Sequence, residues 1–245
     1  MCCLLVCPPK HRPTLQVLEA VAAANPHGGG IAWRESGVVQ YLKTDDVKEI
    51  FRVAREAKGE VVIHFRIASV GGVCAELRHP FPVTRRAGLG DRSSAPAVLF
   101  QNGTWSGWRE AVEEAALEGH TPPAGKMSDA RAAAWLCHVK GRHDWLDETG
   151  WSRWVFMSFR ELHLYGDWQE RDGIMFSNLH WTGRDKSPLP HSQTGTKPKP
   201  AARPKPLVPS LRQDCRQIGL PFSPSREFLE SADRIRSRNL STNWR

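Results

Sequence analysis

The chain opens with a methionine and a cysteine, two residues that together could carry nucleophilic chemistry. Methionine aminopeptidase removes an initiator methionine when a small residue follows, so loss of Met1 would leave a thiol and a free α-amine together on Cys2. A free α-amine has a pKa of roughly 7.7 to 8.0, so it can accept the thiol proton near neutral pH. The alternative is that Cys2, Cys3 and Cys7 are small apolar residues of a buried first strand, because free cysteine is often buried. This stretch alone favours the buried strand.

A basic residue, Arg66, stands inside the apolar run of residues 63–71. A guanidinium in such a run needs an anionic partner, and its planar fork suits a carboxylate that accepts two hydrogen bonds. The partner is either a substrate carboxylate or a side chain in a structural ion pair. The run itself predicts a strand that ends in a glycine turn.

Two further segments present polar groups at the ends of predicted elements. Residues 99–103 predict a strand that ends in Asn102-Gly103, which is either a hairpin turn or a pair of donors for an oxyanion. In acyl transfer each such donor contributes roughly 3 to 4 kcal/mol. Residues 127–131 predict a helix start, where Ser128 or Asp129 caps the helix and Asp129 could also accept a substrate ammonium.

The elements that must position these residues are short strands and helices. Runs rich in β-branched and aromatic residues predict strands at residues 3–6, 30–33, 38–41, 60–68, 97–100, 154–158, 162–165 and 173–177. Apolar residues three and four apart predict helices at residues 15–24, 47–57, 108–117 and 129–140. Polar turns are expected at residues 160–161 and 167–172. This pattern predicts an α+β fold in which helices pack on antiparallel sheets.

Composition limits the class of protein. With 245 residues, 40% of them hydrophobic, the chain can bury one substantial core, and it has no apolar run near the ~18 residues of a membrane span. The six cysteines show no regular spacing, which argues against a disulfide framework and for a reducing, cytoplasmic setting. There is no C-x-x-C, and His138 and His143 near Cys137 form no recognisable ligand set, so no zinc or other metal site is expected.

Charge and proline content divide the chain into three parts. Residues 184–245 hold 13 Lys and Arg against 5 Asp and Glu, which accounts for the net charge of +8 and leaves residues 1–183 neutral. Seven prolines in residues 184–209 indicate a flexible, extended linker. Residues 210–245 form a basic tail, in which residues 224–238 could form a short helix. The sequence therefore predicts one compact domain at residues 1–183 followed by this linker and tail.

Taken in order, the motifs resemble those of a class II glutamine amidotransferase domain of the N-terminal nucleophile (Ntn) hydrolase superfamily. The corresponding segments are Met1-Cys2-Cys3 and residues 27–32, 64–71, 79–81, 101–103, 128–131 and 172–178. The resemblance covers roughly residues 2–183 and implies an Ntn-hydrolase-like αββα sandwich, in which helices flank two antiparallel sheets. Three positions depart from the family pattern, with Cys3 in place of Gly, Gln101 in place of His and Arg131 in place of Glu.

The resemblance also implies catalytic roles. Cys2 would be the nucleophile with its own α-amine as base, and Asn102 with the N–H of Gly103 would form the oxyanion hole. The implied reaction is hydrolysis of the glutamine side-chain amide through a thioester on Cys2, with release of ammonia. No metal or organic cofactor is implied.

The same resemblance implies substrate-binding roles. Arg66 would bind the α-carboxylate of glutamine and Asp129 its α-ammonium, which fits the two opposite charges on a free amino acid. Ser69 and His79 would lie in or behind the pocket wall.

Partners and alternatives follow from the same reasoning. Residues 184–245 are too few for a synthase domain, so the ammonia acceptor is expected to be a separate protein, which the basic tail would hold. Two alternatives remain for the compact domain: an Ntn-type amidase for another γ-glutamyl or small amide, and a catalytically impaired binding or regulatory protein. The tail could also contact nucleic acid or serve only as a solvated extension.

Overall fold

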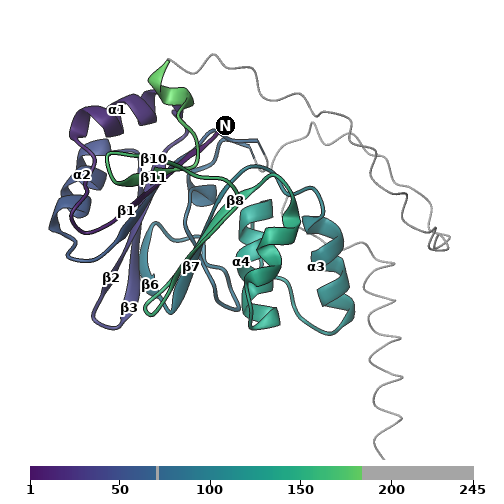
Figure 1. Cartoon of the computed structure of the whole chain (residues 1–245). Helices are drawn as coiled ribbons and strands as arrows, with labels where there is room; N and C mark the ends of the chain where they lie inside the picture. The colour runs from purple at the N-terminus through teal and green to yellow at the C-terminus, as the bar shows by residue number, and fades with distance from the viewer. Residues whose placement is uncertain (70–71, 184–245) are drawn as a thin grey trace, which may run out of the picture.

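The computed structural model describes residues 1–69 and 72–183, which form two antiparallel sheets and four α-helices (Figure 1). Across the larger sheet, its strands are β10 (Gln169–Arg171), β11 (Ile174–Phe176), β1 (Cys3–Cys7), β4 (Val61–Phe65), β2 (Gly29–Glu35), β3 (Val38–Thr44) and β6 (Arg92–Ala95). The smaller sheet contains β5 (Phe81–Pro82), β7 (Ala97–Asn102), β8 (Arg153–Ser158) and β9 (Leu162–Tyr165). The first strand of the chain therefore lies inside the larger sheet, between β11 and β4.

Three of the four α-helices begin where the sequence supplies a side-chain cap. The four are α1 (Leu15–Ala24), α2 (Val47–Glu56), α3 (Trp108–Leu117) and α4 (Asp129–Lys140), with short 3-10 helices η1 (Ala75–Leu77), η2 (Asp144–Thr149) and η3 (His180–Thr182). The side chains of Thr14, Asp46 and Ser128 accept backbone N–H groups in the first turns of α1, α2 and α4. Each cap satisfies a donor that has no partner within the helix, which fixes where the helix starts.

Alternating side chains of the strands pack the two sheets face to face. Leu4 of β1 and Val62 of β4 contact the smaller sheet in an apolar layer that includes Phe100 of β7 and Val155 of β8. Leu5, the next residue after Leu4, points to the opposite face. The apolar layer between the sheets therefore fixes how β1 lies over β7.

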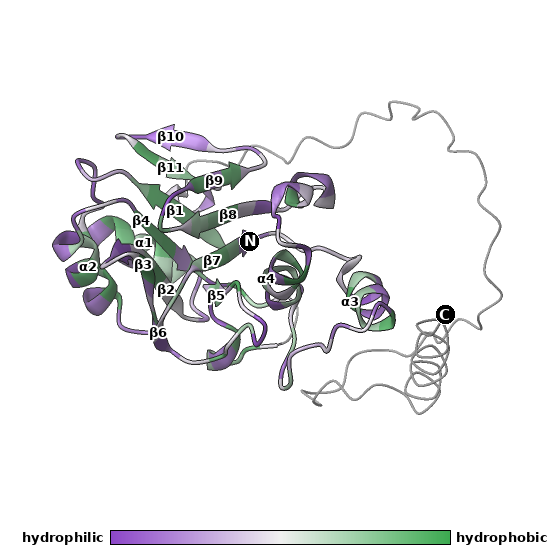
Figure 2. Cartoon of the chain, turned by 90° about the horizontal axis from the view of Figure 1, so that it is seen from below, coloured by the Kyte–Doolittle hydropathy of each residue, from purple (hydrophilic) through white to green (hydrophobic). Residues whose placement is uncertain are grey.

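The helices cover the outer faces of both sheets. On the larger sheet, Leu18 of α1 and Ile50 of α2 pack against Leu5. On the smaller sheet, alanines of α4 pack against Trp154, and α3 packs on the other side of α4. Figure 1 shows α1 and α2 on one side of the sheets and α3 and α4 on the other, and Figure 2 shows apolar strands between them.

The α+β class and the antiparallel sheets are confirmed, and most predicted elements match within two residues. The prediction of a polar turn at residues 167–172 is wrong in part, because Gln169–Arg171 forms the edge strand β10 and pairs with β11. Strands β5 and β6 were not predicted. They are short, and β6 is mostly exposed, so neither has a strong apolar pattern.

Two strand ends differ from the prediction in a way that matters for the site. Strand β4 ends at Phe65 rather than at residue 68, because the backbone of Arg66 bonds to Gly28 and His27 outside the ladder. The Asn102-Gly103 turn does not close a hairpin, since β7 pairs with β8 only after α3 and α4 intervene.

The predicted linker at residues 184–209 and the possible helix at residues 224–238 lie outside the described residues. Within the described part of the chain, every helix is too short or too polar to cross a membrane.

A glycine in β2 is required by close backbone packing. A Cβ on Gly30 would lie 1.9 Å from the carbonyl oxygen of His79, and backbone atoms cannot move aside as a flexible side chain can. We expect Gly30→Ala to lower the free energy of unfolding by about 1–3 kcal/mol or more, in urea denaturation. The matched control is Gly59→Ala, because a Cβ on Gly59 meets nothing within 4 Å. Equal stability of the two variants would contradict the close contact.

Candidate functional site

Six of the seven predicted site residues line one small pocket near the start of β1. The cavity volume is about 20 Å³, which is room for about one water molecule, so an amino acid can enter only if the wall moves outward. Its wall is formed by Cys2, Arg66, Ile67, Ser69, Leu77, His79, Gln101, Gly103, Ser128 and Asp129. The fold therefore brings together residues that lie far apart in the sequence, from both sheets and from the start of α4.

Cys2 is partly buried just before β1, and its side chain faces the backbone that follows β4. The Ile67 N–H donates to Cys2 Sγ at 3.3 Å, and Sγ lies 3.2 Å from the Ile67 carbonyl oxygen. Asn178 Nδ2 donates to the Cys2 carbonyl at 2.7 Å and so holds its backbone. Burial raises the pKa of the Cys2 thiol, although the Ile67 N–H, the positive chain terminus and Arg66 act in the opposite direction. The thiol is thus protonated at neutral pH, and a nearby base is needed to make it a nucleophile.

The neighbouring Cys3 points away from the pocket. It is fully buried in the apolar layer under α1 and α2, with Sγ 3.6 Å from the Asn178 carbonyl oxygen. Burial raises the pKa of Cys3 to about 12, so this thiol stays protonated. Cys3 therefore fills the core and adds no second thiol to the pocket.

Arg66 follows β4 directly and brings a buried positive charge to the pocket. Its Nη1 donates to the Cys74 carbonyl at 3.4 Å. Burial lowers the pKa of Arg66, whereas the acidic groups of Cys2, Cys74 and Asp129 raise it. The guanidinium remains charged, because arginine keeps its proton in proteins.

Asp129 is the first residue of α4 and carries the opposite charge. Its Oδ2 accepts the Trp105 N–H at 2.9 Å and its Oδ1 accepts the Ala130 N–H at 3.0 Å. Burial raises the pKa of Asp129, and these hydrogen bonds together with one from Gln101 lower it. Each carboxylate oxygen has a second lone pair, so Asp129 can still accept hydrogen bonds from a cationic ligand.

Gly103 and Asn102 differ in how they relate to the pocket. Gly103 lines it with a φ of 138°, and a Cβ there would lie 2.7 Å from Ser152 Oγ, so only glycine fits. Asn102 is buried but is not part of the wall, and its Nδ2 donates to Ser177 Oγ at 2.7 Å. Of the two predicted oxyanion donors, Gly103 therefore lines the pocket. Asn102 lies behind the wall, where it is hydrogen-bonded to Ser177.

Gln101, which stands where the family has histidine, lines the pocket and connects two of its parts. Its Nε2 donates to Ser152 Oγ at 3.1 Å, and its side chain also hydrogen-bonds Asp129. It thus ties the end of β7 to the start of α4. On the opposite wall Ser69 Oγ lies 3.4 Å from Thr104 Oγ1.

Two residues that the sequence analysis did not place in the site hold it from behind. Ser177 Oγ accepts the Leu4 N–H at 2.8 Å as well as the Asn102 amide, and Asn178 holds Cys2. Both follow β11, which pairs with β1. The only sequence signal for them was the weak resemblance of residues 172–178 to the last strands of the family.

Arg131, the third departure from the family pattern, has a structural role. Its guanidinium is buried and donates to four backbone carbonyls, at 2.8 Å to Ala87, 3.1 Å to Arg86, 2.9 Å to Ala124 and 2.6 Å to Lys126. It therefore fastens two loops to the first turn of α4, which carries Asp129.

His79 forms the wall of the pocket together with a second buried histidine behind it. The rings of His64 and His79 lie with their centroids 4.1 Å apart. Burial and the positive charge of Arg66 lower the pKa of His64 to about 3, and burial, His64 and Arg66 hold the pKa of His79 well below its usual range. Both rings are neutral at neutral pH, so they add no charge to the pocket.

No protein family model matches the chain, and no curated protein matches it.

The two buried histidines should make the fold sensitive to acid. Below pH of about 6.5 the unfolded chain binds protons that folded His64 and His79 do not, so the free energy of unfolding falls as the pH falls from about 6.5 toward 3. We expect up to about 1.4 kcal/mol per pH unit for each histidine, measured by urea denaturation between pH 7.5 and 5.0. His79→Gln should flatten this slope and the exposed-site control His120→Gln should not. An unchanged slope in His79→Gln would contradict the assignment.

Proposed function

We propose that the chain is a glutamine amidotransferase or glutaminase subunit of the class II type. It hydrolyses the side-chain amide of glutamine through a thioester on Cys2 and supplies ammonia to a separate acceptor enzyme. The observation that carries this proposal is that a thiol, a buried guanidinium and a buried carboxylate share one small pocket, on Cys2, Arg66 and Asp129. This combination suits a substrate with an electrophilic carbonyl at one end and both charges of an amino acid at the other.

The reaction begins when Met1 has been removed and the α-amine of Cys2 is free. The amine takes the thiol proton, and Sγ attacks the side-chain carbonyl carbon of glutamine to form a tetrahedral adduct. The carbon–nitrogen bond then breaks, and the leaving nitrogen takes the proton from the α-ammonium and departs as ammonia. Water, deprotonated by the same amine, attacks the thioester and releases glutamate. The base is needed because burial raises the pKa of the Cys2 thiol.

The negative charge of the adduct requires hydrogen-bond donors beside Cys2. The N–H of Gly103 is the first donor, and its glycine conformation leaves no side chain in the way. An amide nitrogen carries two N–H groups, and the bond to Ser177 uses one of those on Asn102. The second N–H of Asn102 completes the oxyanion hole when substrate is bound.

The α-groups of glutamine are bound by the two buried charges. The planar guanidinium of Arg66 binds the α-carboxylate through two hydrogen bonds, and the free lone pairs of Asp129 accept the α-ammonium. Ser69 and His79 shape the wall, with His79 as a neutral ring. This arrangement favours free glutamine over amides that lack either α-group.

The proposal extends to fold family and partner. The helix, sheet, sheet and helix layers support an Ntn-hydrolase-like αββα sandwich, because β1 begins beside the pocket as an N-terminal nucleophile requires. The free thiols of the described residues are compatible with a cytoplasmic setting. We assign the basic residues 184–245 to holding the acceptor protein.

The first test is the intact mass of the full chain, without an N-terminal tag, before and after reaction with a diazo-ketone analogue of glutamine. We expect loss of Met1 and one adduct per chain, absent in Cys2→Ala and retained in Cys74→Ala, whose thiol is also accessible. Retention of Met1, or an adduct that survives in Cys2→Ala, would refute the proposed nucleophile. Ammonia release from other γ-glutamyl amides but not from glutamine would instead identify an amidase of different specificity.

The second test separates the roles of the two charges. Arg66→Lys and Asp129→Asn should each lower kcat/KM for glutamine roughly 10- to 100-fold, because each loses a charge-assisted hydrogen bond worth about 1.5–3 kcal/mol. Asp129→Asn should have little effect on an amide substrate that lacks the α-amine. The control is Arg160→Lys, in the exposed turn between β8 and β9. Equal losses with both substrates would show that Asp129 does not bind the ammonium.

A further inference from the structure

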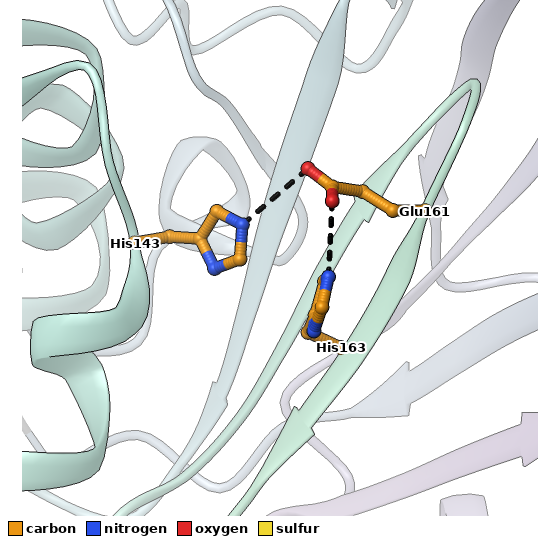
Figure 3. Close-up of side chains that lie close together, drawn as sticks. All are labelled: His143, Glu161 and His163. Atoms are coloured by element: carbon orange, nitrogen blue, oxygen red, sulfur yellow. Dashed lines mark hydrogen bonds and ion pairs between the residues drawn. The ribbon is translucent and has the colours of Figure 1, made fainter.

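Three side chains with metal-binding groups meet at the edge of the smaller sheet, separate from the pocket of Cys2. They are His143, before η2, Glu161, between β8 and β9, and His163 on β9. His163 Nε2 lies 3.0 Å from Glu161 Oε2, and His143 Nε2 lies 3.4 Å from Glu161 Oε1. Figure 3 shows both rings directed at the two oxygens of the one carboxylate.

The sheet and its neighbours fix the direction of the His143 ring. His143 stacks on Phe156, with ring centroids 3.8 Å apart and planes 17° apart. Phe156 is the partner of His163 across β8 and β9, so the two histidines approach from one face of the sheet. His143 Nδ1 lies 2.5 Å from the hydroxyl of Tyr165, which orients the ring from its other side. Histidines that bind metals are usually held in this way through their second nitrogen.

The two histidine contacts with Glu161 differ in length. At 3.0 Å the contact of His163 is an ordinary hydrogen bond. At 3.4 Å the contact of His143 is longer than the usual 2.7–3.2 Å of an N–H···O bond. Two ligand atoms that each lie 2.0–2.1 Å from a tetrahedral zinc ion are about 3.3 Å apart. The distance between His143 Nε2 and Glu161 Oε1 matches this separation. The ligand atoms of all three residues lie within 4.8 Å of one another. Small side-chain movements at this exposed edge can therefore bring all three to bonding distance of one ion.

The surroundings favour a cation. The carboxylates of Asp144 and Glu161 line the same cleft as His143. Arg142 also lines this cleft, and its guanidinium is already paired with Asp144 at 2.6 Å. The Glu161 carboxylate, whose contacts in the cluster are with the two histidines, therefore supplies a negative charge for a bound cation.

We propose that His143, Glu161 and His163 form a binding site for a divalent transition-metal ion of the zinc class. Two imidazoles and one carboxylate are a donor set that zinc accepts and that magnesium or calcium, which prefer oxygen, does not. Three protein ligands leave a fourth position for water. His143 and Glu161 also line a cleft with Phe156 and Asp144, so this position is open to solvent and to small ligands.

Such an ion would strengthen the connection between parts of the chain that packing and the contacts of His143 with Tyr165 and Glu161 already link. His143 precedes η2, and Glu161 and His163 belong to the last two strands of the smaller sheet. Binding to the folded state alone stabilises that state by mass action, so the midpoint of thermal unfolding should rise with zinc concentration.

The test is zinc binding by the full chain after treatment with a chelator, followed by competition with a chromophoric chelator. Because Cys2 could itself bind zinc, the Cys2→Ala protein is measured in parallel. We expect one zinc per chain in both proteins, at least a 100-fold loss of affinity in His163→Ala, and a 10- to 100-fold loss in Tyr165→Phe. His120→Ala, which changes an exposed histidine elsewhere, should bind as the unmodified chain does.

A cobalt-substituted sample gives a readout of geometry that does not depend on activity. Tetrahedral coordination by His143, Glu161 and His163 should give visible absorption bands that disappear in Glu161→Gln. Unchanged zinc affinity in His163→Ala, loss of zinc in Cys2→Ala, or no binding at about 1 mM zinc would overturn the proposal. If no zinc binds at that concentration, the three side chains form only a cluster held by their own polar contacts. Folding of each variant is checked by its urea denaturation midpoint in the presence of chelator.

Discussion

The candidate site depends on the pairing of β1 with β4 in the larger sheet. The antiparallel register sets Cys3 opposite Phe65, so Cys2 and Arg66 meet just past the paired residues. On its other side β1 pairs with β11, which places Ser177 and Asn178 against the same end of the strand. A shift of one residue would move every side chain of β1 to the opposite face and carry Cys2 away from the pocket. The buried layers on both faces of β1 make such a shift costly.

Burial controls the electrostatics of the pocket. It raises the pKa of the Cys2 thiol and of Asp129, and it lowers the pKa of Arg66 and of the two histidines. The histidines become neutral, whereas Arg66 stays charged because its pKa starts so high. The pocket thus combines a fixed positive group with a carboxylate held by backbone N–H groups. Both charges are buried, so we expect the free energy of unfolding to be sensitive to substitution of either residue.

The sequence predicts the elements and the site residues better than it predicts the contacts between them. Helix α4 is readable because Ser128 is a typical cap and Gly141 a typical end, and Arg66 stands out because a charge interrupts an apolar run. The Cys3 side chain points away from the pocket because successive side chains of a strand point to opposite faces of the sheet. The hydrogen bond from Asn102 to Ser177 could not be predicted from the sequence, since it depends on which strands are neighbours in the folded sheets. The cluster around His143 was missed for the same reason, because the register that sets His163 opposite Phe156 is a property of the folded sheet.

Arg131 connects the position of Asp129 to the geometry of two distant loops. Its four carbonyl acceptors come from residues 86–87 and 124–126, and each distance depends on the path of the loop that supplies it. An insertion or deletion in either loop would withdraw acceptors from a guanidinium that has no access to water in their place. During evolution, loop length and the residue at position 131 should therefore change together. Homologous chains with a glutamate at position 131 should differ in the loops that contain residues 86–87 and 124–126. An alignment of such chains would show this covariation.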